Sequence, residues 1–396
     1  VLSKALFNLL TMKEVRPELT KAGVPMAMLR LTRVENAELN LLAMKMLNNY
    51  SCEAAAYVHM FIEMKVVRVM IDQCTAPAGG VAIKRTCGGT LANLSFVPEL
   101  IDVIMGESIV LGLKSIAAAA DPNPGADDPT IDHCATVLYN LGATEHCRDA
   151  LSAQNVVPVL THICKVGGGD ARQLAIATIC NLSCCAAAHE AIVEHCIELL
   201  CETVREPLYP QDTRMNAVRC VCNLVVYYTP ARKACVDAEM SIALAVVYKT
   251  LVDEEDKAII AKILRDLSWY TGGIVLMLNQ GATSTLLKLA KMEEASIKHD
   301  VVSAITNLCA CRLQSPIVEE GVVEALFWIT LQDCLSLTTS VWRETSISVR
   351  YLLQHPTLLP MVALEDKLLQ VLLKLARFME CADTRLNAAV SLYHLL

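Results

Sequence analysis

The sequence predicts an all-α solenoid, in which short helices stack side by side along the chain. The first indication is a pattern of a small or apolar residue, an apolar residue, any residue, Asn and Leu, seen around Asn181. The second is its return at steps of 41 to 47 residues, the length of two or three helices with their connections. Its Asn position is filled in turn by Asn8, Asn49, Asn93, Asn140, Asn181, Asn223, Asp266, Asn307, Tyr351 and His394.

The same unit fills the chain from end to end, which predicts one elongated array and no separate domains. Residues 1–14 are expected to form the last helix of a partial repeat, and an apolar start of this kind leads us to expect a longer polypeptide. Nine repeats then follow at approximately 15–54, 55–98, 99–145, 146–186, 187–228, 229–271, 272–312, 313–356 and 357–396.

Each repeat is predicted to hold three helices, and the first full repeat shows their order. A short helix over 16–25 is broken by Gly23 and Pro25, an apolar helix follows over 26–32, and the Asn-bearing third helix starts near Glu38. Glycine between the first two helices permits a left-handed corner. Equivalent glycines stand at Gly281 and Gly321. The longest step contains a Pro-, Gly- and Asp-rich insertion at 121–129, which predicts a loop.

Two further rows precede the Asn position. Eleven residues before it, side chains suited to capping predict the start of the third helix, namely Glu38, Asp170, Asp212, Ser296 and Asp383. Nine residues before it stands a basic row. Nine residues correspond to 900° on a helix, half a turn from the Asn face, so these side chains are predicted to be structural or outward-facing: Lys84, Arg172, Arg214, Lys257, Lys298 and Arg385.

Composition narrows the function classes. Hydrophobic residues make up 54% of the chain, which suits helices covered by neighbours on two sides. The apolar stretch near 109–120 is too short for a membrane span and carries Lys114. A net charge of −8 argues against nonspecific nucleic-acid binding. We therefore expect protein partners, with no nucleic acid, no membrane span and no small-molecule substrate.

Eighteen cysteines are interpreted mainly as small apolar core residues, as abundant free thiols would be in a reducing compartment. The densest ligand-type cluster lacks the C-x2-C spacing of zinc sites, and its histidines are six residues apart, so they cannot share one ion as an i, i+4 pair does. We therefore predict no metal and no cofactor there, at Cys180, Cys184, Cys185, His189, His195 and Cys196. No nucleophile or phosphate-loop motif supports catalysis, so we expect no enzyme and no catalytic residues.

The Gly or Gly-Pro corners and the Ala-Leu-x-Asn-Leu pattern of the third helix resemble the armadillo-repeat family over essentially the whole chain. A HEAT array is the second choice, although HEAT units generally have two helices and lack a regular Asn. The resemblance implies a right-handed armadillo-type α-solenoid of three-helix repeats whose third helices line a concave groove. It also implies that the recurring Asn faces that groove and binds the main chain of an extended partner.

A carboxamide can satisfy both a peptide N–H and a peptide C=O, which makes this role chemically reasonable. The candidate peptide-binding residues are Asn49, Asn93, Asn140, Asn181, Asn223 and Asn307. The alternative is that each Asn bonds to a neighbouring helix and only maintains the stacking register. The last two repeats, with Tyr351 and His394 in place of Asn, are expected to contribute less to peptide binding.

One turn before the Asn, import carriers of the family have a Trp. None of the corresponding positions of this chain holds a Trp, so the resemblance is to the non-importin type. Four of these positions are basic instead, at Lys4, Lys45, Arg219 and Lys262. They resemble family members that bind acidic segments, and we include Lys45, Arg219 and Lys262 among the candidate site residues.

The sequence therefore predicts a noncatalytic scaffold or adaptor that binds an extended, acidic protein segment in its groove. The alternative is a structural subunit of a large cytoskeletal assembly, such as a ciliary axoneme, that contacts partners by its convex and end surfaces. A cytoplasmic location is expected in either case, cytoskeletal or ciliary in the second.

Overall fold

The computed structural model describes residues 2–77, 80–120, 129–311, 321–331, 337–356, 358–363 and 365–396. The chain divides by its internal contacts into two compact units, which we call unit 1 (Val1–His195) and unit 2 (Cys196–Leu396). All regular elements of the described residues are helices. The predicted insertion at 121–129 lies outside the described residues except for Pro129, the first residue of α10.

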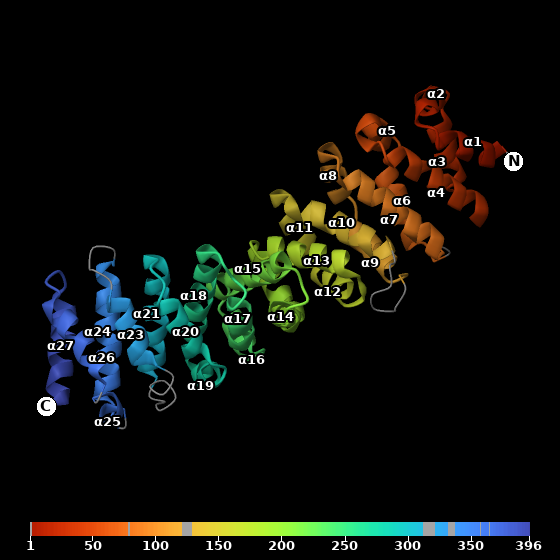
Figure 1. Cartoon of the computed structure of the whole chain (residues 1–396). Coiled ribbons are helices and arrows are strands. Elements are labelled where there is room, and N and C mark those ends of the chain that lie inside the picture. Colours follow the sequence, from red (N-terminus) through yellow and green to blue (C-terminus); the bar gives the residue numbers. More distant parts are fainter. Residues whose placement is uncertain are drawn as a thin grey trace. The chain divides into compact units, whose positions relative to one another are not determined.

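Unit 1 contains three-helix repeats (Figure 1). Its first helices are α2 (Arg16–Lys21), α5 (Val58–Glu63), α8 (Pro98–Met105) and α11 (Arg148–Ala153). Its second helices are α3 (Val24–Leu31), α6 (Val66–Thr75), α9 (Ile109–Ala117) and α12 (Val157–Val166). Its third helices are α1 (Leu2–Leu10), α4 (Ala37–Ser51), α7 (Val81–Ser95), α10 (Pro129–Ala143) and α13 (Gly169–Leu182). Short 3-10 turns lead into first helices, namely η1 (Lys13–Val15), η2 (Ala54–Tyr57) and η3 (Glu145–Cys147). A fourth, η4 (Ala186–Ala188), precedes α14 (His189–Arg205).

Unit 2 repeats the same order after α14 (His189–Arg205), the helix within which the two units meet in sequence. Its first helices are α16 (Pro230–Asp237), α19 (Ile274–Asn279), which follows η5 (Thr271–Gly273), and α25 (Leu359–Val362). Its second helices are α17 (Met240–Tyr248), α20 (Ala282–Ala290), α23 (Val322–Leu331) and α26 (Asp366–Arg377). Its third helices are α15 (Gln211–Tyr227), α18 (Glu254–Ser268), α21 (Ala295–Ala310), α24 (Thr339–Gln354) and α27 (Ala382–Leu395).

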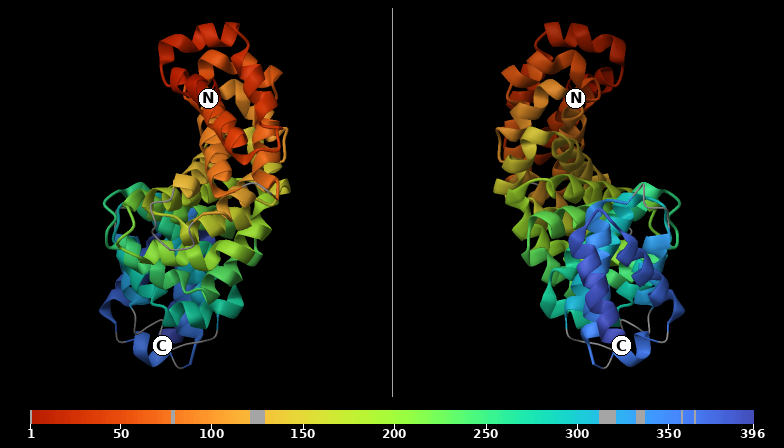
Figure 2. Two further views of the ribbon diagram at one scale, coloured as in Figure 1. Left: turned by 90° about the vertical axis from the view of Figure 1, so that its right-hand side faces the viewer. Right: turned by 90° about the vertical axis from the view of Figure 1, so that its left-hand side faces the viewer.

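Helices of the same kind stack in rows within each unit. In unit 1 the third helices pack in the order α1, α4, α7, α10 and α13, and in unit 2 in the order α15, α18, α21, α24 and α27. The second helices form a parallel row, from α6 through α9 to α12 and from α17 through α20 and α23 to α26. Figure 2 shows that the N-terminus lies at an end of the unit 1 stack and the C-terminus at an end of the unit 2 stack. The predicted all-α solenoid of three-helix repeats is therefore confirmed.

The core consists mainly of small aliphatic side chains and thiols, as the composition predicts. Cys87, Cys220 and Cys235 are fully buried between helices. Burial raises the pKa of the Cys74 thiol to about 12, which keeps it neutral. The cysteines of the described residues are free thiols. Larger groups are few, and one of them, the buried Trp342, stacks on Phe378 with ring centroids 4.9 Å apart.

Most described corners between first and second helices use a left-handed residue, and the expected glycines are in place. The corner between α8 and α9 is an exception, because Gly106 there has φ of −66°. Gly23, Gly281 and Gly321 have φ of 77°, 77° and 92°. The same conformation is adopted by Lys65, with φ of 51°, and by Asn155 and Glu239 in other repeats. A sequence rule based on glycine misses these corners, because surrounding packing holds a non-glycine residue in the left-handed region.

The repeat predicted at 187–228 departs from the three-helix plan. Its first and second helices are replaced by α14, a single helix of 17 residues. No Gly or Pro interrupts the sequence of α14, so nothing stops the helix at the expected corner.

The predicted capping residues of the third helices are wrong by two positions. Glu38, Asp170, Asp212, Ser296 and Asp383 lie in the first turn, each as the second helical residue. The capping position of α4 is Asn36, whose side chain accepts a hydrogen bond from the Leu39 amide at 3.0 Å. The acidic members of the row instead favour the helix through its dipole, which attracts negative charge to the first turn.

In the basic row on the helix face opposite the Asn, the most buried side chains bond to neighbouring helices. The Arg214 Nε donates to the Val204 carbonyl at 3.1 Å, and its Nη1 donates to the Thr250 hydroxyl at 3.2 Å. The fully buried Lys298 donates from Nζ to the Trp328 carbonyl at 3.4 Å. These cations satisfy carbonyls at the ends of neighbouring helices, which otherwise lack intrahelical partners.

Candidate functional site

The recurring Asn side chains link successive third helices. The Nδ2 of Asn93 donates to Ser51 Oγ, that of Asn140 to Ser95 Oγ and that of Asn307 to Ser268 Oγ, each at 2.9 Å. Each acceptor lies two residues after the Asn position of the preceding repeat. The Asn therefore does maintain the stacking register, as the alternative interpretation holds. A serine two residues after the Asn position, as in Asn49-x-Ser51, Asn93-x-Ser95 and Asp266-x-Ser268, was the signal that could have revealed this pairing.

These bonds leave part of each carboxamide available. A carboxamide has two N–H donors and one oxygen acceptor, and the Asn–Ser bond uses one donor. Within the described part of the chain, no group donates to Oδ1 of Asn93, Asn140 or Asn307. All three residues are half-buried, so their remaining polar atoms can meet a ligand without leaving the helix surface. Stacking and ligand binding by the same Asn are therefore compatible.

Two Asn positions lack the serine acceptor. For Asn49 the corresponding residue is Leu10, whose side chain cannot accept a hydrogen bond. The Nδ2 of Asn49 is buried without a hydrogen-bond partner among the described residues. For Asn181 the corresponding residue is Gly142, which has no side chain and packs against Thr178. Asn181 is half-buried on α13, and Asn223 is half-buried on α15 in unit 2.

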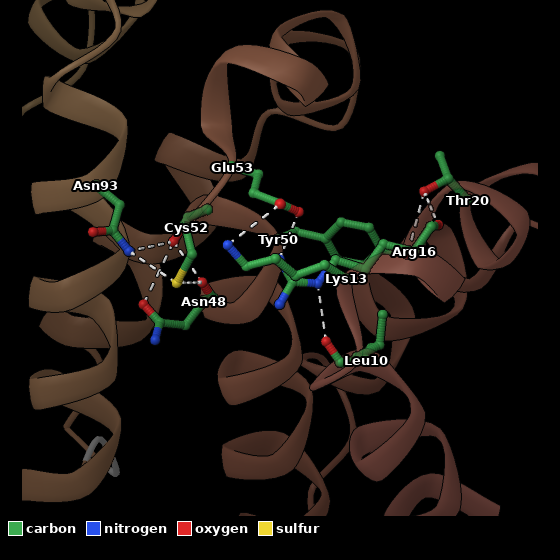
Figure 3. Close-up of polar contacts among 10 residues, drawn as sticks. Leu10, Lys13, Arg16, Thr20, Asn48, Tyr50, Cys52, Glu53 and Asn93 are labelled. Atoms are coloured by element: carbon green, nitrogen blue, oxygen red, sulfur yellow. Dashed lines mark hydrogen bonds and ion pairs between the residues drawn. The ribbon is translucent and has the colours of Figure 1, made fainter.

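Figure 3 shows the best-defined polar surroundings of a candidate Asn, at the step from α4 to α7. The Nδ2 of Asn93 lies 3.8 Å from Cys52 Sγ, in addition to its bond with Ser51. Beside it is a cavity of about 480 Å³ lined by Ser51, Cys52, Glu53, Ala54, Ala55, Ala56, Asn93, Phe96 and Val97. Phe96 is 67% exposed at its edge. The arrangement offers a carboxamide next to a mainly apolar depression.

The base of this step is held by a buried arginine, also drawn in Figure 3. Arg16 is 4% exposed, and its Nε donates to the Leu10 carbonyl at 3.0 Å while Nη1 pairs with Glu53 at 2.7 Å. Lys13 lies 3.7 Å from the same carboxylate. Arg148 donates in the same way to the Gly142 carbonyl at 2.9 Å. These arginines close the ends of third helices and hold the neighbouring helices in place.

The basic candidates differ in their surroundings. Lys45 is exposed on α4, and Lys262 is half-buried on α18. Neither forms an ion pair within the described residues. Arg219 on α15 does, because its Nη2 lies 3.0 Å from Asp256 Oδ1. The predicted cation at Lys4 is also paired, with Glu38 at 2.9 Å.

Carboxylates dominate the surface around Arg219. A cavity of about 710 Å³ there is lined by Arg219, Asp253, Glu254, Glu255, Asp256, Ala258, Glu294 and Ser296. One guanidinium faces five carboxylates, so the local field opposes an acidic ligand. The expectation that Arg219 binds an acidic segment therefore needs correction, because its charge is used within the chain.

The cysteine and histidine cluster forms internal contacts. Cys185 donates to Asp149 Oδ1 at 2.6 Å, and His189 Nε2 bonds with the Ser183 carbonyl at 2.9 Å. Burial, with the hydrogen bond to Asp149 as a lesser cause, raises the pKa of the Cys185 thiol. Across the described ranges, no three His, Cys, Asp or Glu side chains come close enough to hold a metal ion.

Hydrophobicity gives no clear membrane segment. In the described helices, none alone combines the length and apolar character that would let it cross a membrane. The segments Gly169–Leu182 and Ala186–Arg205 have that length and apolar character only when they are taken together, and the chain bends between them.

Sequence reasoning missed one cluster on the third-helix face, around Arg343 and Arg350 in unit 2. The two arginines stand seven residues apart on α24, which places them two turns apart on the same face. Tyr351 replaces the Asn of this repeat and lies beside them in a common cavity. The spacing of the arginines was the signal that could have found them.

Repeats of a short first helix, a second helix and a long third helix, stacked in rows, define an armadillo-like repeat fold. No protein-family model matches the chain, and no curated protein matches it. An engineered protein solved by the Northeast Structural Genomics Consortium is 19% identical, with a TM-score of 0.58, over 99% of this chain and 94% of its own. This likeness shows the fold over the whole chain.

Two designed armadillo repeat proteins are also similar over part of the chain. One, computationally designed for modular peptide recognition, is 17% identical with a TM-score of 0.49, covering 60% of this chain and 99% of that one. The other is 16% identical with a TM-score of 0.47, covering 61% of this chain and 100% of that one.

Proposed function

We propose that this chain is a noncatalytic scaffold that binds an extended protein segment along its third helices. The observation that carries the proposal is the row of half-buried Asn carboxamides, three of which, Asn93, Asn140 and Asn307, are fixed by one bond to the preceding repeat. A fixed carboxamide loses little conformational entropy on binding, and its oxygen and second N–H match a peptide N–H and C=O. Several in succession match the repeating main chain of an extended segment.

In unit 1 the proposed contacts are Asn93, Asn140 and Asn181, with Asn49 at the start of the row. In unit 2 they are Asn223 and Asn307. Asn181 is the strongest candidate because Gly142 supplies no internal acceptor for its Nδ2. Lys45 and Lys262 are the proposed free cations of the surface, and they favour a carboxylate on the partner through charge complementarity.

The test is a phage-displayed library of random 12-residue peptides selected on the full chain. A selected peptide is then labelled, and its affinity for variants is measured by fluorescence anisotropy. The Asn140→Ala/Asn181→Ala variant is expected to lose about tenfold or more in affinity, since each lost hydrogen bond costs on the order of 1 kcal/mol.

A matched control removes two exposed polar side chains from the second helix of the same repeat, as His162→Ala/Lys165→Ala on α12. This variant is expected to retain the affinity of the unaltered chain. Equal binding by the two variants would contradict recognition by the third helices.

A further inference from the structure

The third-helix face of unit 2 contains a cavity of about 400 Å³ between α24 and α27, lined by Arg343, Ile347, Arg350, Tyr351, Gln354, Asp383, Leu386 and Asn387. The α24 residues Arg343, Ile347, Arg350 and Gln354 recur at intervals of three or four, and Tyr351 lies four residues after Ile347, so the five form one stripe along that helix. Tyr351 occupies the recurring Asn position. The cavity therefore lies on the face that carries the Asn row in the other repeats.

One arginine in the cavity is held in place by a buried side chain. Asn387 is 8% exposed, and its Nδ2 donates to Ser346 Oγ at 3.1 Å. Its Oδ1 accepts a hydrogen bond from Arg350 Nη1, also at 3.1 Å. A guanidinium has five N–H donors in a planar fork, so one bond fixes the group and leaves donors for a carboxylate.

The second arginine adds charge with a looser contact. Arg343 Nε lies 3.6 Å from Asp383 Oδ2, and both side chains are mostly exposed. An exposed pair of this length contributes little and is readily exchanged for another carboxylate. Two guanidinium groups against one carboxylate leave the cavity with a net positive charge.

Apolar groups stand beside these cations. Leu386 on α27 is 61% exposed, and Tyr351 on α24 is 40% exposed. Ile347 forms part of the wall between them. The cavity thus combines a site for a carboxylate with a surface for an apolar side chain.

We propose that this cavity binds an Asp or Glu side chain of the extended partner together with an apolar side chain two positions away. In an extended peptide, residues two apart point to the same side, so both can enter one cavity. The inference rests on the proposed function and assigns this repeat a side-chain contact where Tyr351 has replaced the main-chain contact. The carboxylates around Arg219 oppose an acidic residue there, whereas two guanidinium groups in the α24–α27 cavity favour one.

The experiment selects two phage libraries of random 12-residue peptides on the full chain, one with a free C-terminus and one without. The same libraries are selected in parallel on the Arg343→Gln/Arg350→Gln variant and on the matched control Arg385→Gln. Arg385 is an exposed cation of α27 outside the cavity. Circular dichroism and the thermal unfolding midpoint establish that each variant is folded, and Leu386→Ala provides a second test that leaves Arg350 and Asn387 paired.

The expected result is enrichment, in both libraries, of peptides with Asp or Glu two positions from an apolar residue. This preference should disappear with Arg343→Gln/Arg350→Gln and persist with Arg385→Gln. A selected peptide should bind the double variant at least about tenfold more weakly, since hydrogen bonds to charged groups are the stronger ones, and Leu386→Ala should weaken it to a lesser degree.

Three outcomes would overturn the inference. Enriched peptides without this acidic and apolar pair, or with a pair that survives loss of both arginines, would refute the cavity's role and leave the proposed function standing. Enrichment confined to the library with free C-termini would show that the cavity takes a terminal carboxylate instead. Failure of both libraries to enrich on the unaltered chain would refute the proposed function itself.

Discussion

The carboxamide of Asn93 donates from Nδ2 to Ser51 Oγ at 2.9 Å across a sequence separation of 42 residues. The bond joins α7 to α4, and its equivalents join α10 to α7 and α21 to α18. The Asn of this repeat therefore has a stabilising role inside the solenoid in addition to the ligand role we propose. The two roles can be separated by experiment.

A double-mutant cycle on this pair tests the stabilising role. We expect Asn93→Ala and Ser51→Ala each to lower the free energy of unfolding by about 1 kcal/mol, because each breaks a partly buried hydrogen bond. The double variant should cost less than the sum, since neither partner is left unsatisfied. Urea unfolding followed by circular dichroism measures all three. Strict additivity would show that the bond contributes nothing.

Asn181 should behave differently from Asn93. Its position lacks a serine acceptor, so Asn181→Ala is expected to lower the free energy of unfolding by less than about 0.5 kcal/mol. The same change should weaken a selected peptide several-fold, because the carboxamide is reserved for the ligand. Unfolding and peptide binding are measured on the same preparation. A large loss of stability with unchanged binding would assign Asn181 a structural role.

The left-handed corner at Lys65 offers a stabilising substitution. A non-glycine residue in this conformation destabilises the fold by about 1 to 2 kcal/mol. Glycine avoids this strain but loses more conformational entropy on folding, which offsets part of the gain. We expect Lys65→Gly to raise the free energy of unfolding by about 0.5 to 1 kcal/mol.

The control for this corner is Gly281→Ala, which should be destabilising. Its φ is 77° and a new Cβ would meet no atom within 4 Å, so only backbone strain is added. Urea midpoints of both variants test the argument. Destabilisation by Lys65→Gly would show that the Lys65 side chain contributes more than the corner costs.

The carboxylate of Glu324 should make unit 2 sensitive to acid. The Trp328 Nε1 donates to it at 3.1 Å, while Lys291 and Lys367 lie 3.3 and 3.6 Å away. The Trp328 hydrogen bond, followed by the lysines, lowers the pKa of Glu324 below its ordinary value. Because the folded pKa lies below the unfolded one, this stabilisation is present above the unfolded pKa of about 4.3 and is lost as the pH falls through the folded pKa.

Thermal unfolding of the chain and of Glu324→Gln tests this relation. The unaltered chain should have the higher midpoint at pH 7, and the difference should shrink as the pH falls below about 4. If the difference in midpoint stays constant over this pH range, the charge of Glu324 is not what stabilises the unaltered chain.

Thiol labelling tests the burial of cysteines in the core. Among the described cysteines, Cys52 and Cys184 are exposed, whereas Cys74, Cys87 and Cys235 are buried. Burial raises the pKa of all three buried thiols, so they should label only on unfolding, while the exposed pair labels quickly in the native state. Mass spectrometry of timed samples follows each thiol. Rapid native labelling of Cys235 would contradict the packing of α16.

The sequence predicted the third helices well because their Asn position returns with a regular apolar frame, as at Asn140 and Asn307. It missed the caps by two residues, since Asp170 and Asp212 favour a helix start both as caps and as first-turn charges. It missed the corner at Lys65, where tertiary packing overrides the preference for glycine. The Arg219–Asp256 pair joins residues 37 apart, a separation at which spacing alone does not reveal contact.

The central claim is that an extended peptide lies along the third helices. Photocrosslinking tests it most directly, with p-benzoylphenylalanine placed either at Tyr139 on the third helix α10 or at Leu111 on the second helix α9, both exposed. The account predicts that a labelled, library-selected peptide is captured at position 139 and not at position 111. Capture at position 111, with none at 139, would contradict it.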